Sequence, residues 1–206
     1  MPTLLTYALT TVARAKVFLD ISTSDDDTLI ERLINSATDF IEKYCDRRFK
    51  KATYSNEIYN GSGSNKLLLK QYPVDSASAF TLEKRDSISN EDSFSDIESE
   101  DYFVHWDKGI VENVRSIFYS YPRHYRISYA AGYNYDNVAS YLSDVGAADL
   151  EYACWKLVSY LYDEAGTDGG IQSESLGDYS VSYMKATMAD DELKGILNKY
   201  KRPFGN

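Results

Sequence analysis

The side chains of this sequence that could do chemistry are few and widely separated. A nucleophilic triad needs a base beside its nucleophile, and the chain contains only His105 and His124. Neither histidine belongs to a catalytic spacing, so both are interpreted as surface or half-buried strand residues. The sequence therefore predicts no catalytic residues and no enzyme. A small hydrolase that uses the loop Ser173–Asp178 is kept as an alternative of a different class.

That loop belongs to the polar stretch "GGIQSESLGDYSVSY", which runs from Gly169 to Tyr183. The preceding "GTDGG" is not followed by Gly-Lys-Ser/Thr, so it does not form a phosphate-binding P-loop. "SESLG" does not match the G-x-S-x-G pattern of a nucleophile elbow. A connection of this length is uncommon in a compact domain unless it has a function. We interpret the stretch as a contact with another chain.

The sequence predicts no metal site and no cofactor. Neither HExxH nor CxxC is present, and the acidic run "SNEDSFSDIESE" lacks the alternation and the central glycine of a calcium loop. Cys45 and Cys154 lie on apolar faces of predicted helices. Both are therefore expected to be small core residues rather than reactive thiols.

The chain is acidic, with a net charge of −10 and an isoelectric point of about 4.7. Non-specific DNA binding depends on Lys and Arg that neutralise phosphates, so we expect no autonomous binding of nucleic acid. The 19 tyrosines fit either a protein–protein interface or half-exposed strand positions. No apolar run reaches membrane length, and no signal peptide is recognised. We expect no membrane contact and synthesis in a reducing cytoplasm.

Hydrophobic periodicity predicts four helices, two toward each end of the chain. The first follows a cap at Thr10 or Thr11, and the second is expected to be capped by Ser24 and to run to Tyr44. The other two cover about 147–164 and 189–200, and the last ends before Pro203.

Between these pairs, residues 52–133 alternate with the period of β-strands. "TYSNEIYN" and "KLLL" flank the turn "GSGSN" and predict one hairpin, while "DYFVHW" and "GIVENV" predict another. The intervening acidic stretch 86–101 contains no Lys or Arg and is interpreted as a solvated excursion.

These elements predict a mostly α fold. We expect one domain over residues 1–206: a helical bundle of about four helices, with a β-rich insertion between helices two and three. The helical core would comprise 8–50 and 144–203, and the insertion 52–133.

Several stretches together resemble the head–tail connector, or adaptor, proteins of tailed bacteriophages. The opening segment Tyr7–Phe49 is similar to the start of that family. Further similarities, in the same order along the chain, are "LLLKQYPV", "ISYAAGY", "SESLGDYSVSY" and "KYKRP". The acidic excursion departs from the family pattern, so the resemblance maps the β-rich insertion less closely than the helices.

The resemblance implies a structural protein of the virion neck, assembled in the host cytoplasm. Its copies would form a homo-oligomeric ring, a dodecamer, beneath the portal protein and extend the DNA channel. The ring would dock the next head-closure or tail protein, and DNA would pass without specific binding. A head-closure or tail-completion protein one layer further down is the alternative within the same assembly.

Two segments are the expected contacts with neighbouring proteins. One is the polar loop before the last helix, and the other is the basic end of that helix, whose cations could instead complement the helix dipole. The interface residues predicted on this basis are Leu176, Gly177, Asp178, Tyr179, Lys199, Lys201 and Arg202.

Overall fold

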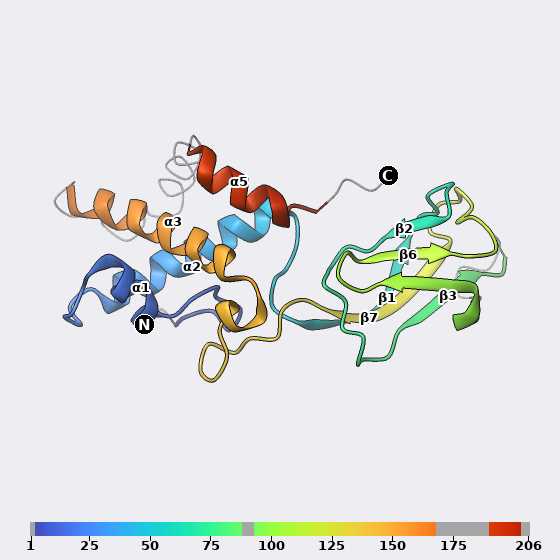
Figure 1. Cartoon of the computed structure of the whole chain (residues 1–206), viewed down its shortest axis with the longest axis horizontal. Helices are drawn as coiled ribbons and strands as arrows, with labels where there is room; N and C mark the ends of the chain where they lie inside the picture. The colour runs from blue at the N-terminus through green and yellow to red at the C-terminus, as the bar shows by residue number, and fades with distance from the viewer. Residues whose placement is uncertain (1–2, 88–92, 168–189, 203–206) are drawn as a thin grey trace. The chain divides into compact units, whose positions relative to one another are not determined.

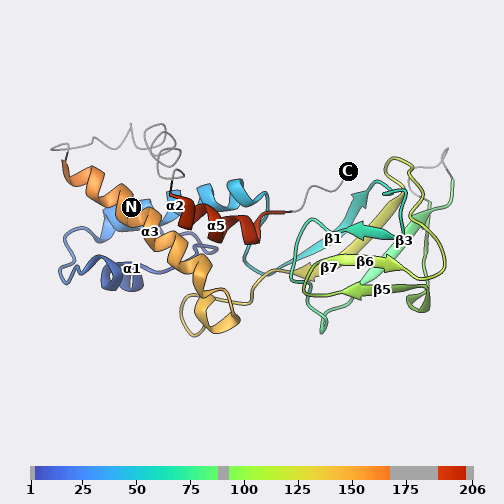
Figure 2. The same ribbon diagram turned by 45° about the horizontal axis from the view of Figure 1, so that its top comes forward.

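The computed structural model describes residues 3–87, 93–167 and 190–202. The chain divides into two compact units. A helical unit comprises Met1–Phe49 and Asn134–Lys201, and a β unit comprises Lys50–Tyr133 and Arg202–Asn206. Both are drawn in Figure 1 and, from another side, in Figure 2.

The helical unit contains α1 (Val12–Leu19), α2 (Asp27–Cys45), α3 (Ala148–Thr167) and α5 (Asp191–Tyr200). The short 3-10 helix η2 (Leu142–Val145) precedes α3. The Thr11 side chain caps α1 by accepting a hydrogen bond from the Arg14 amide, and Asp190 caps α5 in the same way. The predicted Ser24 cap is wrong, because α2 begins at Asp27 with Asp26 at its N-cap.

One apolar core joins these helices. Its members recur at helical spacing and are fully or almost fully buried: Ile30, Leu33, Ile34, Ala37 and Ile41 on α2, Leu150, Ala153, Leu157 and Val158 on α3, and Leu193 and Leu197 on α5. A polar network lies beside this core. The buried Glu151 carboxylate accepts hydrogen bonds from Thr10 and Arg14, and Trp155 donates its indole N–H to the Thr10 hydroxyl. These hydrogen bonds connect Thr10, just before α1, and Arg14, within α1, to α3.

The β unit consists of two antiparallel sheets. The four-stranded sheet has the order β1 (Ala52–Tyr59), β7 (Tyr125–Ala131), β3 (Thr81–Arg85), β4 (Phe94–Asp96). The three-stranded sheet has the order β2 (Lys66–Leu68), β6 (Ile110–Asn113), β5 (Tyr102–His105), and the 3-10 helix η1 (Ser99–Asp101) leads into β5. Figure 2 shows β5 and β6 side by side. The predicted hairpin of β5 and β6 is confirmed, whereas the predicted hairpin of β1 and β2 is wrong, because they pair with β7 and β6.

Side chains from both sheets build one core in this unit. It contains Tyr59, Leu67, Leu69, Val74, Leu82, Val111, Phe118, Tyr125, Ile127, Tyr129 and Ala131. Burial at alternate positions of β7 follows from the period of a strand, which sends every second side chain to the same face. The unit therefore has the facing apolar surfaces that an independent core requires.

The predicted mostly α fold is thus wrong. Helix accounts for 36% of the chain and strand for 22%, so neither class describes it alone. The strand segment between α2 and α3 is not an appendage of a helical bundle, because its two sheets bury a core of their own. Within the described residues, no helix combines the length and the apolar character needed to cross a lipid bilayer.

The acidic stretch 86–101 is also more ordered than expected. Phe94–Asp96 pairs with β3 as an edge strand, and Ile97 packs against the core of the β unit. The Phe94 ring lies 4.4 Å from the Arg126 guanidinium, in cation–π geometry. The interpretation as a solvated excursion is therefore wrong for Phe94, Ser95 and Ile97, whereas Asp96 and Glu98–Glu100 are exposed. Residues 88–92 lie outside the described residues.

Glycine 61 provides a test of how tightly the β unit is packed. A Cβ at Gly61 would lie 1.6 Å from the Tyr119 carbonyl oxygen, whereas a Cβ at Gly195 in α5 meets nothing within 4 Å. We expect Gly61→Ala to destabilise the β unit by at least about 1–3 kcal/mol, because two backbone segments must separate. Gly195→Ala should instead stabilise α5, by up to about 1 kcal/mol. Urea unfolding measures both changes, and a neutral Gly61→Ala would contradict this packing.

The two cysteines should be chemically inert in the folded protein. Both are fully buried, and burial raises the pKa of Cys45 and of Cys154 to about 12. Because the thiolate is the reactive form, a thiol reagent at pH 8 should modify the native protein at least roughly a thousandfold more slowly than the urea-unfolded protein. Rapid labelling of the native protein would show that one of the two thiols is accessible.

Candidate functional site

The predicted interface residues fall into three groups in the structure. Leu176, Gly177, Asp178 and Tyr179 lie outside the described residues. Lys199 and Lys201 lie at the end of α5 in the helical unit, and Arg202 belongs to the β unit. The interface role of all seven residues stays a prediction.

Within the helical unit, both lysines have local partners. The Lys199 ammonium is 3.3 Å from an Asp149 carboxylate oxygen, in an exposed ion pair. The Lys201 ammonium lies 5.1 Å from the centre of the Tyr44 ring. Tyr200, between them, packs edge-on against Phe49 and donates a hydrogen bond to Asp149. The end of α5 is therefore attached to the rest of its unit.

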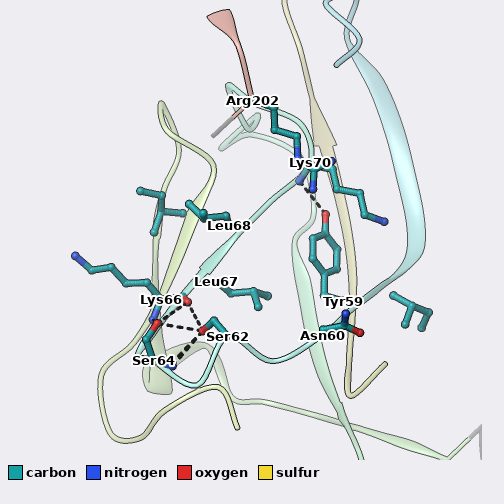
Figure 3. A pocket seen from close by; sticks show the side chains of 11 residues that line it. Tyr59, Asn60, Ser62, Ser64, Lys66, Leu67, Leu68, Lys70 and Arg202 are labelled. Carbon is teal, nitrogen blue, oxygen red and sulfur yellow. Dashed lines mark hydrogen bonds between the residues drawn. The ribbon is translucent and has the colours of Figure 1, made fainter. Parts of the chain in front are cut away.

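Arg202 lines a groove of about 570 Å³ on the β unit. The other lining residues come from β1, β2 and the turns beside them, and from the start of β6: Ile58, Tyr59, Asn60, Ser62, Ser64, Lys66, Leu67, Leu68, Lys70 and Ile110. Figure 3 shows Lys70 and Arg202 at one end of the groove and Ser62, Ser64 and Lys66 at the other. We call this the lysine groove.

The two ends of the lysine groove are fixed by hydrogen bonds. At one end, the Ser62 hydroxyl donates to the Lys66 carbonyl at 2.5 Å and lies 3.1 Å from the Ser64 hydroxyl. At the other end, the Lys70 amide donates to the Tyr59 hydroxyl, and the Lys70 ammonium lies 4.8 Å from the centre of the Tyr59 ring. Local contacts therefore hold the walls of this groove.

Tyr59 connects the lysine groove to the core of the β unit. Its hydroxyl donates to a Glu57 carboxylate oxygen at 2.7 Å and lies 2.9 Å from the Tyr129 hydroxyl. Burial is the main reason why the pKa of Tyr59 is raised well above its ordinary value, and the neighbouring Tyr129 adds to it. The hydroxyl therefore stays protonated and serves as a structural link between β1 and β7.

The lysine groove is lined by cations and hydroxyl groups. Its charged members are Lys66, Lys70 and Arg202, and its hydroxyls have no histidine beside them in the lining. Cations of this kind attract carboxylates or phosphates of a partner. A loose pair of Lys70 with Glu57, at 3.9 Å, partly balances the charge.

Both histidines contact neighbouring side chains of the β unit. His105 is hydrogen-bonded to Glu112 at 3.0 Å, and this contact lowers the pKa of Glu112. His124 packs edge-on against Tyr121 and Tyr125. Ser173 and Ser175, the candidate nucleophiles, lie outside the described residues. In the part of the chain that the structure describes, no three His, Cys, Asp or Glu side chains are grouped to hold a metal ion.

The sequence analysis missed Lys66 and Lys70. A signal was present in "NKLLLKQY", where two lysines bracket three consecutive leucines. Such a pattern indicates a strand with an apolar face and cations beside it, but it does not reveal that Arg202 lies at the same groove. That proximity arises only from the tertiary structure.

The fold of two units, one helical and one of two antiparallel sheets, can be compared with known proteins. Residues 8–203 match the family described as "Head completion protein". The chain therefore belongs to the head completion protein family, a family of structural proteins, and the resemblance to phage connector proteins is confirmed.

Solved structures with the same fold come from gene transfer agent (GTA) particles. One is described as "Neck of empty GTA particle computed with C6 symmetry"; it shares 15% identity and a TM-score of 0.58 over 100% of this chain and 96% of that chain. Another, "Neck of native GTA particle computed with C12 symmetry", shares 14% identity and a TM-score of 0.51 over 100% of this chain and 98% of that chain. No curated protein matches the chain.

A tyrosine substitution tests the link between the lysine groove and the core. We expect Tyr59→Phe to lower the free energy of unfolding by about 1–3 kcal/mol, because the Lys70 amide loses its acceptor and the Glu57 carboxylate loses one of its two tyrosine donors. The control is Tyr121→Phe, whose exposed hydroxyl makes no hydrogen bond within the described residues and should change stability by less than about 0.5 kcal/mol. Equal effects of the two substitutions would contradict the structural role of Tyr59.

Proposed function

We propose that this protein is an adaptor of the head–tail neck of a virion or virus-like particle. Its copies form a ring, twelvefold in the particle, that sits beneath the portal protein and extends the DNA channel. The ring docks the head-closure or tail protein that follows it. The protein works through contacts and catalyses no reaction.

The observation that carries this proposal is the family match over nearly the whole chain, from 8 to 203. The fold supports it, since the similar chains come from necks solved with sixfold and twelvefold symmetry. A closed ring needs two different surfaces on each subunit, one for each neighbour. Two units of different composition can supply such a pair of surfaces.

The distribution of charge also supports a channel protein. The helical unit carries 20 Asp and Glu against 11 Lys and Arg, and the β unit carries 12 against 11. A ring of acidic subunits repels the phosphates of DNA, so that DNA can slide through without adhering. Specific recognition of nucleic acid is not part of the proposed function.

Particles that lack this protein provide the first test. An adaptor directly beneath the portal predicts tailless heads that lose their DNA and whose portal is bare in electron micrographs. A head-closure or tail-completion protein, which the family name also fits, predicts heads that still carry a ring below the portal. Particles with normal tails would contradict both.

The predicted interface residues can be tested by binding to such heads. We expect Lys199→Glu with Arg202→Glu, and separately Leu176→Ala with Asp178→Ala and Tyr179→Ala, to abolish co-sedimentation with tailless heads. Truncation at Lys199 is unsuitable because it removes Tyr200, which is buried. Lys108→Glu, on the exposed turn between β5 and β6, is the control and should bind normally. Unchanged melting temperatures would confirm that the variants remain folded, and normal attachment of both would place the contacts elsewhere.

A further inference from the structure

A second groove, of about 480 Å³, opens on the β unit away from the lining of the first. Its walls come from the end of β3, from the stretch before β5, and from the segment between β6 and β7. The lining residues are Lys84, Arg85, Asp86, Ile97, Asp101, Asn113, Arg115, Ser116, Ile117, Tyr119, His124 and Tyr125. We call it the tyrosine groove.

Two cations of the tyrosine groove have no counter-ion. Among residues 3–87, 93–167 and 190–202, neither Lys84 nor Arg85 forms an ion pair. The Arg85 Nε is buried and has no hydrogen-bond partner, an arrangement that is costly unless an acceptor arrives. The Arg85 guanidinium carbon lies 5.4 Å from the centre of the Phe94 ring. An aromatic ring offers no oxygen that could accept the hydrogen bond.

The two acids of the groove have contacts of their own. Asp101 Oδ1 forms an ion pair with the Arg115 Nε at 2.8 Å, although the geometry is not that of a hydrogen bond, and Asp86 accepts hydrogen bonds from the Ser93 and Ser95 hydroxyls. Burial and then the charges of Arg85 and Lys84 lower the pKa of His124. The lining holds three cations, Lys84, Arg85 and Arg115, against two acids, Asp86 and Asp101, so a carboxylate would balance its charge.

One margin of the groove is apolar and held in place. Ile117 is 43% exposed, Tyr119 52% and Tyr121 50%, and the two tyrosine rings are stacked with their centres 6.4 Å apart. The fully buried Phe118 anchors this segment, and the Tyr119 amide donates to the Tyr125 hydroxyl at 3.0 Å. Exposed aromatic side chains on a fixed backbone lose little entropy on binding and are typical of interface centres.

A surface with the opposite properties lies on the helical unit, at the end of α1. Val17 is 83% exposed, and Phe18 is partly exposed while its ring stacks on Trp155. Asp20 and Asp25 follow in the connection to α2, and within the described residues neither forms an ion pair. We call these four residues the acidic edge.

We propose that the tyrosine groove of one copy binds the acidic edge of a second copy. In this contact, Asp20 and Asp25 approach Lys84 and Arg85, and Val17 and Phe18 pack against Tyr119 and Ile117. The contact is head-to-tail, because the two surfaces lie on different units of the chain, and it leaves one groove unfilled at one end of a row and one edge unfilled at the other. Such a contact closes a ring when the rotation between copies is a whole fraction of a turn.

The inference rests on the proposed ring and names the surfaces that form it. Charge complementarity favours a second copy over nucleic acid, since the helical unit carries the excess of acids. The acidic edge supplies two carboxylates for Lys84 and Arg85. It also supplies apolar side chains that pack against Ile117 and Tyr119. DNA would supply phosphates but would also meet the repulsion of the whole acidic chain.

Charge reversal on each surface tests the contact. The groove variant carries Lys84→Glu and Arg85→Glu, and the edge variant carries Asp20→Lys and Asp25→Lys. In the groove variant both surfaces are negative, and in the edge variant both are positive. Each alone should therefore form rings, with or without heads, at least tenfold less than the wild type. An equal mixture should form rings, because every contact then joins opposite charges.

The controls distinguish loss of this contact from unfolding and from a general effect of net charge. Lys108→Glu with Lys194→Glu changes the net charge as the groove variant does, but outside both surfaces, and should assemble normally. Circular dichroism and thermal melts establish that each variant is folded. Sedimentation velocity and negative-stain microscopy at low and high salt count the rings, which should weaken as salt screens the charges.

Three results would contradict the contact or the ring itself. Rings from either variant alone, or failure of the mixture while the wild type forms rings, would overturn the inference and leave the neck function intact. A groove variant that assembles normally but binds single-stranded or duplex DNA more weakly would assign the tyrosine groove to nucleic acid instead. A wild type that forms no ring, either free or on heads, would overturn the proposed function and, with it, this inference.

Discussion

Strand β7 is the element on which the β unit depends. It pairs with β1 on one side and β3 on the other, and its residues Tyr125, Ile127, Tyr129 and Ala131 enter the core. Tyr129 also meets Tyr59 through a hydrogen bond, which fixes the strand next to the lysine groove. The segment that carries Tyr119 leads directly into β7, and Tyr125 of β7 lines the tyrosine groove. The same strand therefore supports both grooves. A central strand with partners on both edges has no free backbone groups along its length, so it is the least able to shift.

The two units differ in charge and in the surfaces that they can present to a neighbour. The β unit is nearly neutral by charge, so its cations act locally, and it presents them from grooves whose walls are fixed by hydrogen bonds and aromatic packing. The helical unit holds most of the excess acid, and its buried Glu151 is paired with Arg14. Among the described residues, Lys84 and Arg85 on one unit and Asp20 and Asp25 on the other form no ion pair, so a subunit has two unlike surfaces. Unlike surfaces are what a ring of identical copies requires.

A neck protein must bind several neighbours tightly without retaining DNA. Surface ion pairs contribute little each, about 0–1 kcal/mol, so a single contact of this kind would not hold a ring together. Repetition around a closed ring multiplies weak contacts, and in the proposed contact the exposed side chains of Ile117, Tyr119 and Tyr121 would add apolar area to each. The net negative charge of the chain repels the phosphates of nucleic acid. One charge pattern can therefore favour contacts between copies and disfavour adhesion of the passing duplex.

The sequence by itself determined the helices, the β5–β6 hairpin and the family. The helices could be predicted because their signals are local: apolar residues at helical spacing, the N-cap at Thr11 and the acids at the start of α5. These signals act through hydrogen bonds and burial between residues close in the chain. The sequence could not assign the partners of β1, because a turn such as "GSGSN" favours a hairpin while the pairing with β7 is decided by a core gathered from distant strands. Nor could it reveal that β4 pairs with β3 and that Ile97 packs against that core, or that Arg202 lies beside Lys70. Those facts depend on long-range packing, in which residues far apart in the chain exclude water from the same space.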